Sequence, residues 1–169
     1  MPLALPPTSP PHRPAVAALD NERIRTIHRL VQQRGQRLTS ARLRVLHILA
    51  GADGPLKAYA VLDEIRRTLP GTGPTAVYRA MEFLQFHGWA VKLNSINAYL
   101  FLPPGTPGNC TFLVCDTCTS VAMLRSAPLE PGWVAASRHL GFVPATHAVE
   151  ISGRCAQCVS QRAAGGDPR

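Results

Sequence analysis

The chain has 169 residues and a formal net charge of +8, and its length allows one average domain or two small ones. Residues 1–95 hold 13 basic and 6 acidic side chains, whereas residues 96–169 hold 5 and 4, so the excess positive charge lies in the first half. A basic half favours a polyanionic partner such as nucleic acid, although many solvated surfaces carry the same excess. No apolar run is long enough to span a bilayer, which argues against an integral membrane protein.

Residues 1–18 are rich in proline and lack the continuous apolar core of a signal peptide, so we expect a disordered arm and a cytoplasmic protein. Asp20 can cap a helix over residues 21–33, and Gly35 can end it. The apolar face of this helix would contain Ile24, Ile27, Leu30 and Val31.

Two further helices are predicted by apolar residues at helical spacing. One begins at Thr39 or Ser40, and it should turn Leu43, Leu46 and Leu49 inward and Arg42 and Arg44 outward. The next follows Pro55 and ends at the Pro70-Gly71 break, with Ala58, Val61, Leu62 and Ile65 on its apolar face.

The fourth helix has the clearest boundaries, because Gly73 can cap it, Pro74 suits its first position and Gly88 can follow its end. Its buried stripe would be Val77, Ala80, Met81 and Leu84. Two short β-like runs, residues 89–93 and 98–102, flank a turn-rich tetrapeptide and predict a hairpin. Helices followed by a hairpin indicate a winged helix, a DNA-binding architecture.

In that geometry the fourth helix would enter the major groove, while the third helix and the hairpin would approach the DNA backbone. The candidate DNA contacts are Lys57, Tyr59, Thr75, Tyr78 and Arg79. Each of them taken alone could equally belong to an ordinary solvated helix face.

Four of the five cysteines form two Cys-x-x-Cys pairs, Cys115 with Cys118 and Cys155 with Cys158. Each pair follows an apolar strand-like run, residues 111–114 and 148–151. Four thiolates suit the closed tetrahedral site of structural zinc. The alternatives are unrelated reduced pairs or a redox couple, and we expect neither pair to open a helix as a thioredoxin-like pair would. The second half, with a helix near residues 131–140, also has too small a core to fold without such a metal.

Six segments in order resemble the ferric-uptake-regulator superfamily, and most closely its zinc-uptake-regulator branch. They are Arg37-Leu38-Thr39, Lys57-Ala58-Tyr59-x-x-Leu62-Asp63, Pro74-Thr75-x-Val77-Tyr78-Arg79-Ala80, Ser95-Ile96-Asn97-Ala98-Tyr99, Phe112-Leu113-Val114-Cys115-Asp116-x-Cys118 and Val149-Glu150-x-x-Gly153-x-Cys155-x-x-Cys158.

The resemblance implies a homodimeric repressor that binds an inverted-repeat operator, with its four paired cysteines on a structural Zn²⁺. It implies that Tyr59 and Arg79 contact DNA, with Arg79 a candidate for bidentate reading of guanine. It also implies a second, regulatory metal site in the hinge between the domains. At the corresponding positions this sequence has Val91, Leu102, a loop over residues 103–109 without histidine, and Met123. We therefore expect that zinc holds the fold but does not switch DNA binding through that site.

A substitute metal or redox site could use Cys110, His147 and Glu150, although a three-residue spacing in a strand places the last two on opposite faces. The fold class expected is α+β: a disordered arm (1–18), a winged-helix domain (19–102), a dimerisation domain with the zinc site (103–160) and a disordered tail (161–169). The expected partners are double-stranded DNA and a second copy, with no membrane and no small-molecule substrate, and no enzyme activity is expected. The competing hypothesis is a zinc-stabilised adaptor that acts through protein partners or mixed dimers.

Overall fold

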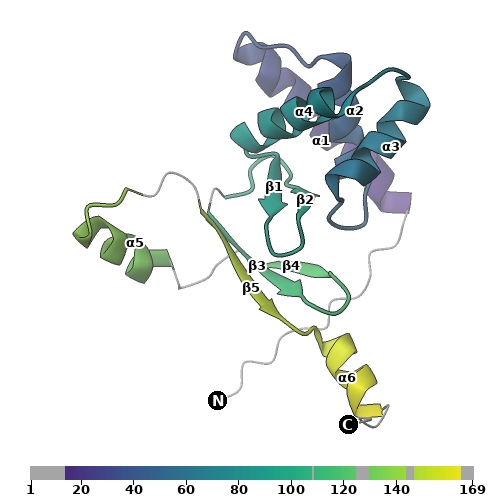
Figure 1. Cartoon of the computed structure of the whole chain (residues 1–169). Coiled ribbons are helices and arrows are strands. Elements are labelled where there is room, and N and C mark those ends of the chain that lie inside the picture. The colour runs from purple at the N-terminus through teal and green to yellow at the C-terminus, as the bar shows by residue number, and fades with distance from the viewer. Residues whose placement is uncertain (1–13, 108, 125–129, 144–146, 165–169) are drawn as a thin grey trace.

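The computed structural model describes residues 14–107, 109–124, 130–143 and 147–164 of the chain. Within these ranges the first half consists of α1 (Pro14–Gln33), α2 (Ser40–Ala50), α3 (Ala58–Thr68), α4 (Pro74–Phe86), β1 (Ala90–Leu93) and β2 (Ala98–Phe101). The second half consists of β3 (Asn109–Cys115), β4 (Val121–Leu124), α5 (Glu130–His139), β5 (His147–Gly153) and α6 (Ala156–Ala164). A helical unit with a hairpin stands above a small sheet (Figure 1), and the predicted α+β class is confirmed.

The predicted start of α2 and both predicted ends of α4 are confirmed, because local capping sets them. The side chain of Thr39 accepts a hydrogen bond from the backbone N–H of Arg42 at 3.3 Å and caps α2. Gly73 is the N-cap of α4 and Pro74 occupies its first turn. Gly88 follows α4 with φ +72°, a left-handed conformation that glycine adopts without strain.

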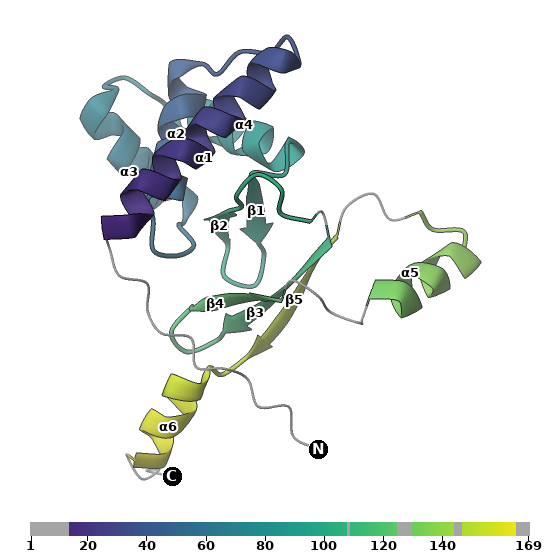
Figure 2. The same cartoon turned by 180° about the vertical axis from the view of Figure 1, so that it is seen from behind.

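The helical unit surrounds one apolar core, and the hairpin closes it from below with Trp89, Ala90 and Tyr99. Figure 2 shows α1 crossing the back of this unit, over α2 and α4. Within this core, the residues without any exposed surface come from all four helices: Ile27, Val45, Leu46, Val61, Ile65, Met81 and Leu84.

Two predictions about the helices are wrong. Helix α1 begins at Pro14, so Asp20 lies inside it instead of capping it; proline is compatible with a first helical turn. Residues 14–18 therefore belong to α1, while residues 1–13 of the expected arm lie outside the described residues. Arg42 and Arg44 are half-buried rather than outward-facing. The guanidinium of Arg42 lies over the Phe83 ring, 3.8 Å from its centroid, and its aliphatic stem can cover apolar surface.

The predicted hairpin is present, with β1 and β2 antiparallel and Ala90 opposite Phe101. Leu56, in the segment between α2 and α3, forms a β-bridge with β2: Leu56 and Tyr99 exchange backbone hydrogen bonds of 2.8 and 2.7 Å. The hairpin is thereby tied to the segment that precedes α3, and its turn points toward the second sheet (Figure 1).

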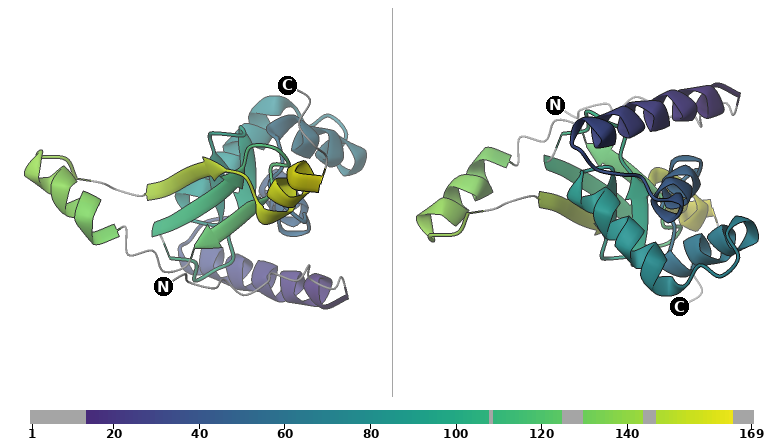
Figure 3. Two further views of the ribbon diagram at one scale, coloured as in Figure 1. Left: turned by 90° about the horizontal axis from the view of Figure 1, so that it is seen from below. Right: turned by 90° about the horizontal axis from the view of Figure 1, so that it is seen from above.

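The second sheet has the order β4-β3-β5, with β3 antiparallel to β4 and parallel to β5. A parallel pair needs a long crossover, and this one contains α5, the helix expected near residues 131–140. In all the views α5 stands away from the sheet (Figure 3). Strand β4 and helix α6 were not predicted; α6 extends to Ala164, into the expected tail, whose residues 165–169 lie outside the described ranges.

Candidate metal centre and nucleic-acid interface

The sheet topology brings the two cysteine pairs together. Strands β3 and β5 run in parallel with Cys115 opposite Gly153, so the turns that follow them emerge at the same end of the sheet. After β3 the chain turns tightly: the Thr119 N–H donates to the Cys115 carbonyl at 3.0 Å, and Thr119 has φ +58°. After β5, Cys155 directly precedes α6 and Cys158 lies in its first turn. Residues about 40 positions apart therefore meet at one point.

The geometry of the four sulfurs fits a tetrahedral metal ion. The Sγ atoms of Cys115, Cys118, Cys155 and Cys158 all lie within 4.8 Å of one another. The Cys118 and Cys155 sulfurs are 3.7 Å apart, and four Zn–S bonds of about 2.3 Å place tetrahedral sulfurs about 3.8 Å apart. A set of four soft donors leaves no open coordination position, as in structural zinc sites. The residues present therefore fit a structural Zn²⁺.

Backbone amides and the crowding of sulfurs set the ionisation of these thiols. The Cys155 N–H donates to the Cys115 sulfur at 3.4 Å, and this and neighbouring N–H groups lower the pKa of Cys115 to about 6. The Cys158 N–H likewise lowers the pKa of Cys155. Hydrogen bonds from the neutral Cys158 thiol to the sulfurs of Cys155 and Cys118 raise the pKa of Cys158 to about 12, and burial and the nearby Cys115 sulfur add to the shift. Binding of a metal ion must therefore displace protons from this cluster.

The expectation that neither pair opens a helix is wrong for the second pair, since Cys155 and Cys158 begin α6. A helix start is where redox cysteine pairs also occur, because the helix dipole stabilises a thiolate. The interpretation as a metal site rests instead on the gathering of four sulfurs, which a redox couple does not need. Among the described residues, this is the only group of at least three His, Cys, Asp or Glu side chains that could hold one ion.

All five candidate DNA-contact side chains lie at the surface of the helical unit. Tyr59 and Tyr78 are 63% and 49% exposed, unusually high fractions for large aromatic residues. Thr75 and Arg79 are exposed on α4, and Lys57 is exposed at the N-cap of α3. The opposite face of α4 is fully engaged in the core through Val77, Ala80, Met81 and Leu84. The first half of α4 thus presents a polar and aromatic face to solvent.

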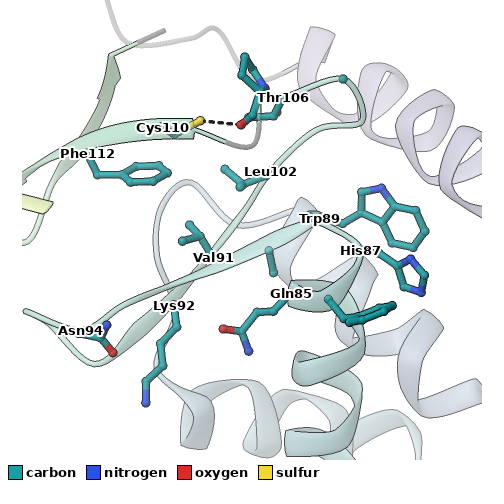
Figure 4. A pocket seen from close by; sticks show the side chains of 15 residues that line it. Gln85, His87, Trp89, Val91, Lys92, Asn94, Leu102, Thr106, Cys110 and Phe112 are labelled. Carbon is teal, nitrogen blue, oxygen red and sulfur yellow. Dashed lines mark hydrogen bonds between the residues drawn. The ribbon is translucent and has the colours of Figure 1, made fainter. Parts of the chain in front are cut away.

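At the junction between the two halves, the positions at which the resemblance expects regulatory ligands hold packed apolar side chains. Leu102 is buried, and Val91 and Met123 are half-buried, in a second apolar cluster. Its buried members are Leu93, Leu102, Cys110, Phe112 and Val114. Figure 4 shows Val91, Leu102 and Phe112 converging beside a groove of about 590 Å³ that continues under the end of α4.

The three residues of the expected substitute site have separate surroundings. The buried Cys110 thiol donates to the Pro107 carbonyl at 3.0 Å (Figure 4). The Glu150 carboxylate accepts hydrogen bonds from Asn94 and Ser95 in the hairpin turn. His147 pairs with Asn109 at the start of β5, and its side chain lies outside what the structure describes. A substitute site built from these three residues stays a prediction.

Sequence reasoning missed the contact between Glu150 and the hairpin turn. The carboxylate accepts hydrogen bonds from the backbone N–H groups of Asn94 (2.7 Å) and Ser95 (3.0 Å) and from the Ser95 hydroxyl (2.6 Å). Burial would raise the pKa of Glu150, but these hydrogen bonds outweigh burial and lower it. The hairpin turn, expected to approach DNA, thus lies against the second sheet; no local sequence signal joins residues this far apart.

Comparison with known proteins identifies the family to which this architecture belongs. Residues 33–152 match the sequence model of the ferric uptake regulator family. The chain belongs to this family. It is therefore a DNA-binding transcription regulator and not an enzyme, as expected from the sequence.

Several relatives of this ferric uptake regulator family member carry the name zinc uptake regulation protein. That of Escherichia coli (strain K12) is 34% identical over 139 residues, which are 80% of each chain. That of Mycobacterium tuberculosis (strain ATCC 25618 / H37Rv) is 29% identical over 128 residues, 75% of this chain and 97% of the relative.

Solved structures agree with the sequence comparison. A zinc uptake regulator complexed with zinc and DNA has a TM-score of 0.78 and 31% identity, with 85% of this chain and 97% of that chain covered. The holo form of XcZur has a TM-score of 0.73 and 36% identity, with 83% and 99% covered.

Proposed function

We propose that this ferric uptake regulator family member is a sequence-specific transcriptional repressor that binds an inverted-repeat operator as a homodimer. The proposal is carried by the two faces of α4: one exposes Thr75, Tyr78 and Arg79 to solvent, and the opposite face packs in the core. A helix held in this way can enter the major groove as a rigid unit, and Arg79 has the donor geometry to read guanine. The likeness to a zinc uptake regulator complexed with zinc and DNA supports this assignment.

We propose that a second copy covers the apolar surface of the C-terminal half. Leu140, Phe142 and Val143, directly after α5, are 86%, 65% and 81% exposed. Strand β5 is an edge strand of the sheet, and Ile151 on it is 40% exposed. Exposed apolar side chains and an open strand edge are each a liability in a monomer, and both suit a symmetric dimer interface. Helices α1 and α6 cross the expected outer limits at residues 19 and 160, so of the expected limits we keep the boundary between residues 102 and 103.

We further propose that one structural Zn²⁺ per chain occupies the four-cysteine cluster, with no regulatory zinc in the hinge. The carbon side chains of Val91 and Leu102 cannot ligate Zn²⁺, and the thioether of Met123 is a poor ligand for it. A ligand shifts a conformational equilibrium only by its different affinity for the two states, so a hinge without the site loses that coupling. Zinc in the cytoplasm would then maintain the fold, but DNA binding would not respond to the zinc concentration.

Salt-dependent DNA binding tests the proposal. The zinc-loaded protein is presented with a randomised duplex pool, and the affinity for the selected sequence is measured over a range of salt concentrations. We expect an inverted repeat and a steep fall of log K with log salt, about −0.9 per phosphate neutralised. A protein that selects no sequence and shows no salt slope would instead be the adaptor, acting through protein partners or mixed dimers.

A further inference from the structure

The two halves of the molecule are joined by a specific polar contact. Glu150, in the middle of β5, accepts three hydrogen bonds of 2.6 to 3.0 Å from Asn94 and Ser95 in the turn between β1 and β2. Two successive backbone N–H groups directed at one anion form a small anion-binding nest, and hydrogen bonds to a charged acceptor are among the stronger ones in proteins. The turn thus binds the carboxylate much as such a nest binds a free anion.

An apolar contact runs beside this polar one. Leu93 and Leu102 of the hairpin pack with Phe112 and Val114 of β3, and Leu93 and Phe112 have no exposed surface. Apolar packing holds two surfaces together but has little directionality. Hydrogen bonds to a carboxylate depend strongly on angle and distance. The two contacts therefore have different effects: the cluster keeps the halves in contact, and the carboxylate fixes their relative orientation.

We propose that Glu150 is a positioning residue that fixes the orientation of the helical unit on the dimerisation sheet by binding the hairpin turn. The proposal rests on the proposed dimeric DNA-binding function, because the orientation of each helical unit sets the distance between the two α4 helices of a dimer. In a hinge packed by Val91, Leu102 and Met123, the carboxylate supplies without a metal the directional contact between the halves.

Three variants test the proposal in the full-length, zinc-loaded protein. E150Q keeps the size of the side chain but removes the charge, and S95A removes the hydroxyl donor. Glu22→Gln is the matched control, since Glu22 is exposed on α1 and its loss changes the net charge equally. Each variant is measured against the inverted repeat selected by the parent protein, against a duplex with one half-site, and against inverted repeats whose spacing is changed by one or two base pairs.

We expect E150Q to bind the full inverted repeat about tenfold more weakly, as for the loss of hydrogen bonds to a charged group, and to discriminate less between spacings. Its half-site affinity should equal that of Glu22→Gln, and S95A should show a smaller effect of the same kind. The double variant with E150Q and S95A should bind the full inverted repeat no more weakly than E150Q alone, because both substitutions break the same contact. A merely structural role would instead weaken half-site and full-site binding in parallel, and this result would overturn the proposal.

A measurement without DNA separates this proposal from the proposed function. Amide hydrogen exchange at Asn94 and Ser95 should be faster in E150Q than in the parent, and small-angle scattering should show a broader distribution of distances. Unchanged exchange and scattering would overturn the positioning role even if the parent binds its operator. If exchange is faster in E150Q but the parent selects no DNA sequence, the positioning role of Glu150 stands and the proposed function is refuted.

Discussion

His87, at the end of α4, lies among aromatic and cationic side chains. Its Nδ1 accepts a hydrogen bond from Arg34 at 2.6 Å, so the neutral ring carries its proton on Nε2. The ring stacks on Trp89, with 4.8 Å between centroids, and meets Phe83 edge-on at 4.5 Å. Burial, together with the charges of Arg34 and Arg42, lowers the pKa of His87 below its ordinary value of 6.5.

This shift predicts a loss of stability on mild acidification. Below pH 6.5 the unfolded chain protonates His87 while the folded protein resists, so the stabilising contribution is present above pH 6.5 and is lost as the pH falls toward the lowered pKa. In His87→Gln the urea midpoint should depend less on pH across this range. His28→Gln, at an exposed position of α1, is the control. Equal pH slopes in the parent and His87→Gln would contradict the account.

At the scale of the helices and strands, the two faces of α4 have different roles: one face stabilises the core and the other is exposed to solvent. Leu84 is fully buried, whereas Phe86, two residues later, is 82% exposed. Leu84→Ala should lower the free energy of unfolding by about 2 to 5 kcal/mol, because it leaves a cavity in the core. Phe86→Ala should change it by less than about 0.5 kcal/mol. Chemical denaturation measures both, and similar values for the two variants would refute the assigned faces of α4.

On the exposed face of α4, a substitution should affect DNA binding and leave stability nearly unchanged. Arg79→Ala should leave the unfolding free energy nearly unchanged and weaken operator binding by about 10- to 100-fold, the usual range for loss of a bidentate arginine–guanine pair. Arg25→Ala, at an exposed position of α1, controls for the loss of one positive charge. If both variants lose the same affinity on every duplex, Arg79 contributes charge but no base reading.

The sequence predicts the helices well where side chains near their ends determine the boundaries. Thr39, Gly73, Pro74 and Gly88 act within one turn of the residues that they influence, so α2 begins, and α4 begins and ends, as expected. The start of α1 was mistaken because both Pro14 and Asp20 suit a helix start, and sequence alone does not choose between them. Helix α6 was missed because it has only nine residues and includes Cys158, so the cysteine pair was interpreted as a turn.

Long-range contacts could be predicted only in part. The four cysteines were grouped correctly because two equal spacings with one chemistry indicate one ion. The contact of Glu150 with Asn94 and Ser95 had no such signal, since backbone N–H groups are present in every turn and only the packing of the two halves selects this one. The half-burial of Arg42 against Phe83 likewise depends on how α2 and α4 pack.

At the scale of the whole molecule, the two apolar clusters differ in size. The core of the helical unit is large and drawn from four helices and the hairpin, whereas the second cluster, where the hairpin meets β3, is small. We therefore expect the small sheet to depend on the four-cysteine site, because a metal ion bound there would tether both of its turns.

Removal of one cysteine should show this dependence. Cys118→Ser should lose the bound zinc and the dimer, while circular dichroism retains most of the helical signal because the helical core is separate. Cys110→Ser is the matched control: Cys110 is buried near Pro107, outside the cluster, and its replacement should leave the zinc content unchanged. A Cys118→Ser protein that contains no metal and remains fully dimeric would contradict the structural role of zinc.

We propose that zinc maintains this regulator without controlling it, because apolar side chains and the Glu150 carboxylate join the two halves where a regulatory site would lie. The most direct test measures zinc per chain together with operator affinity while Zn²⁺ is added to the purified protein. The account predicts one tightly held zinc per chain and an operator affinity that stays constant as more is added. A second equivalent of zinc that binds and raises the affinity would contradict it.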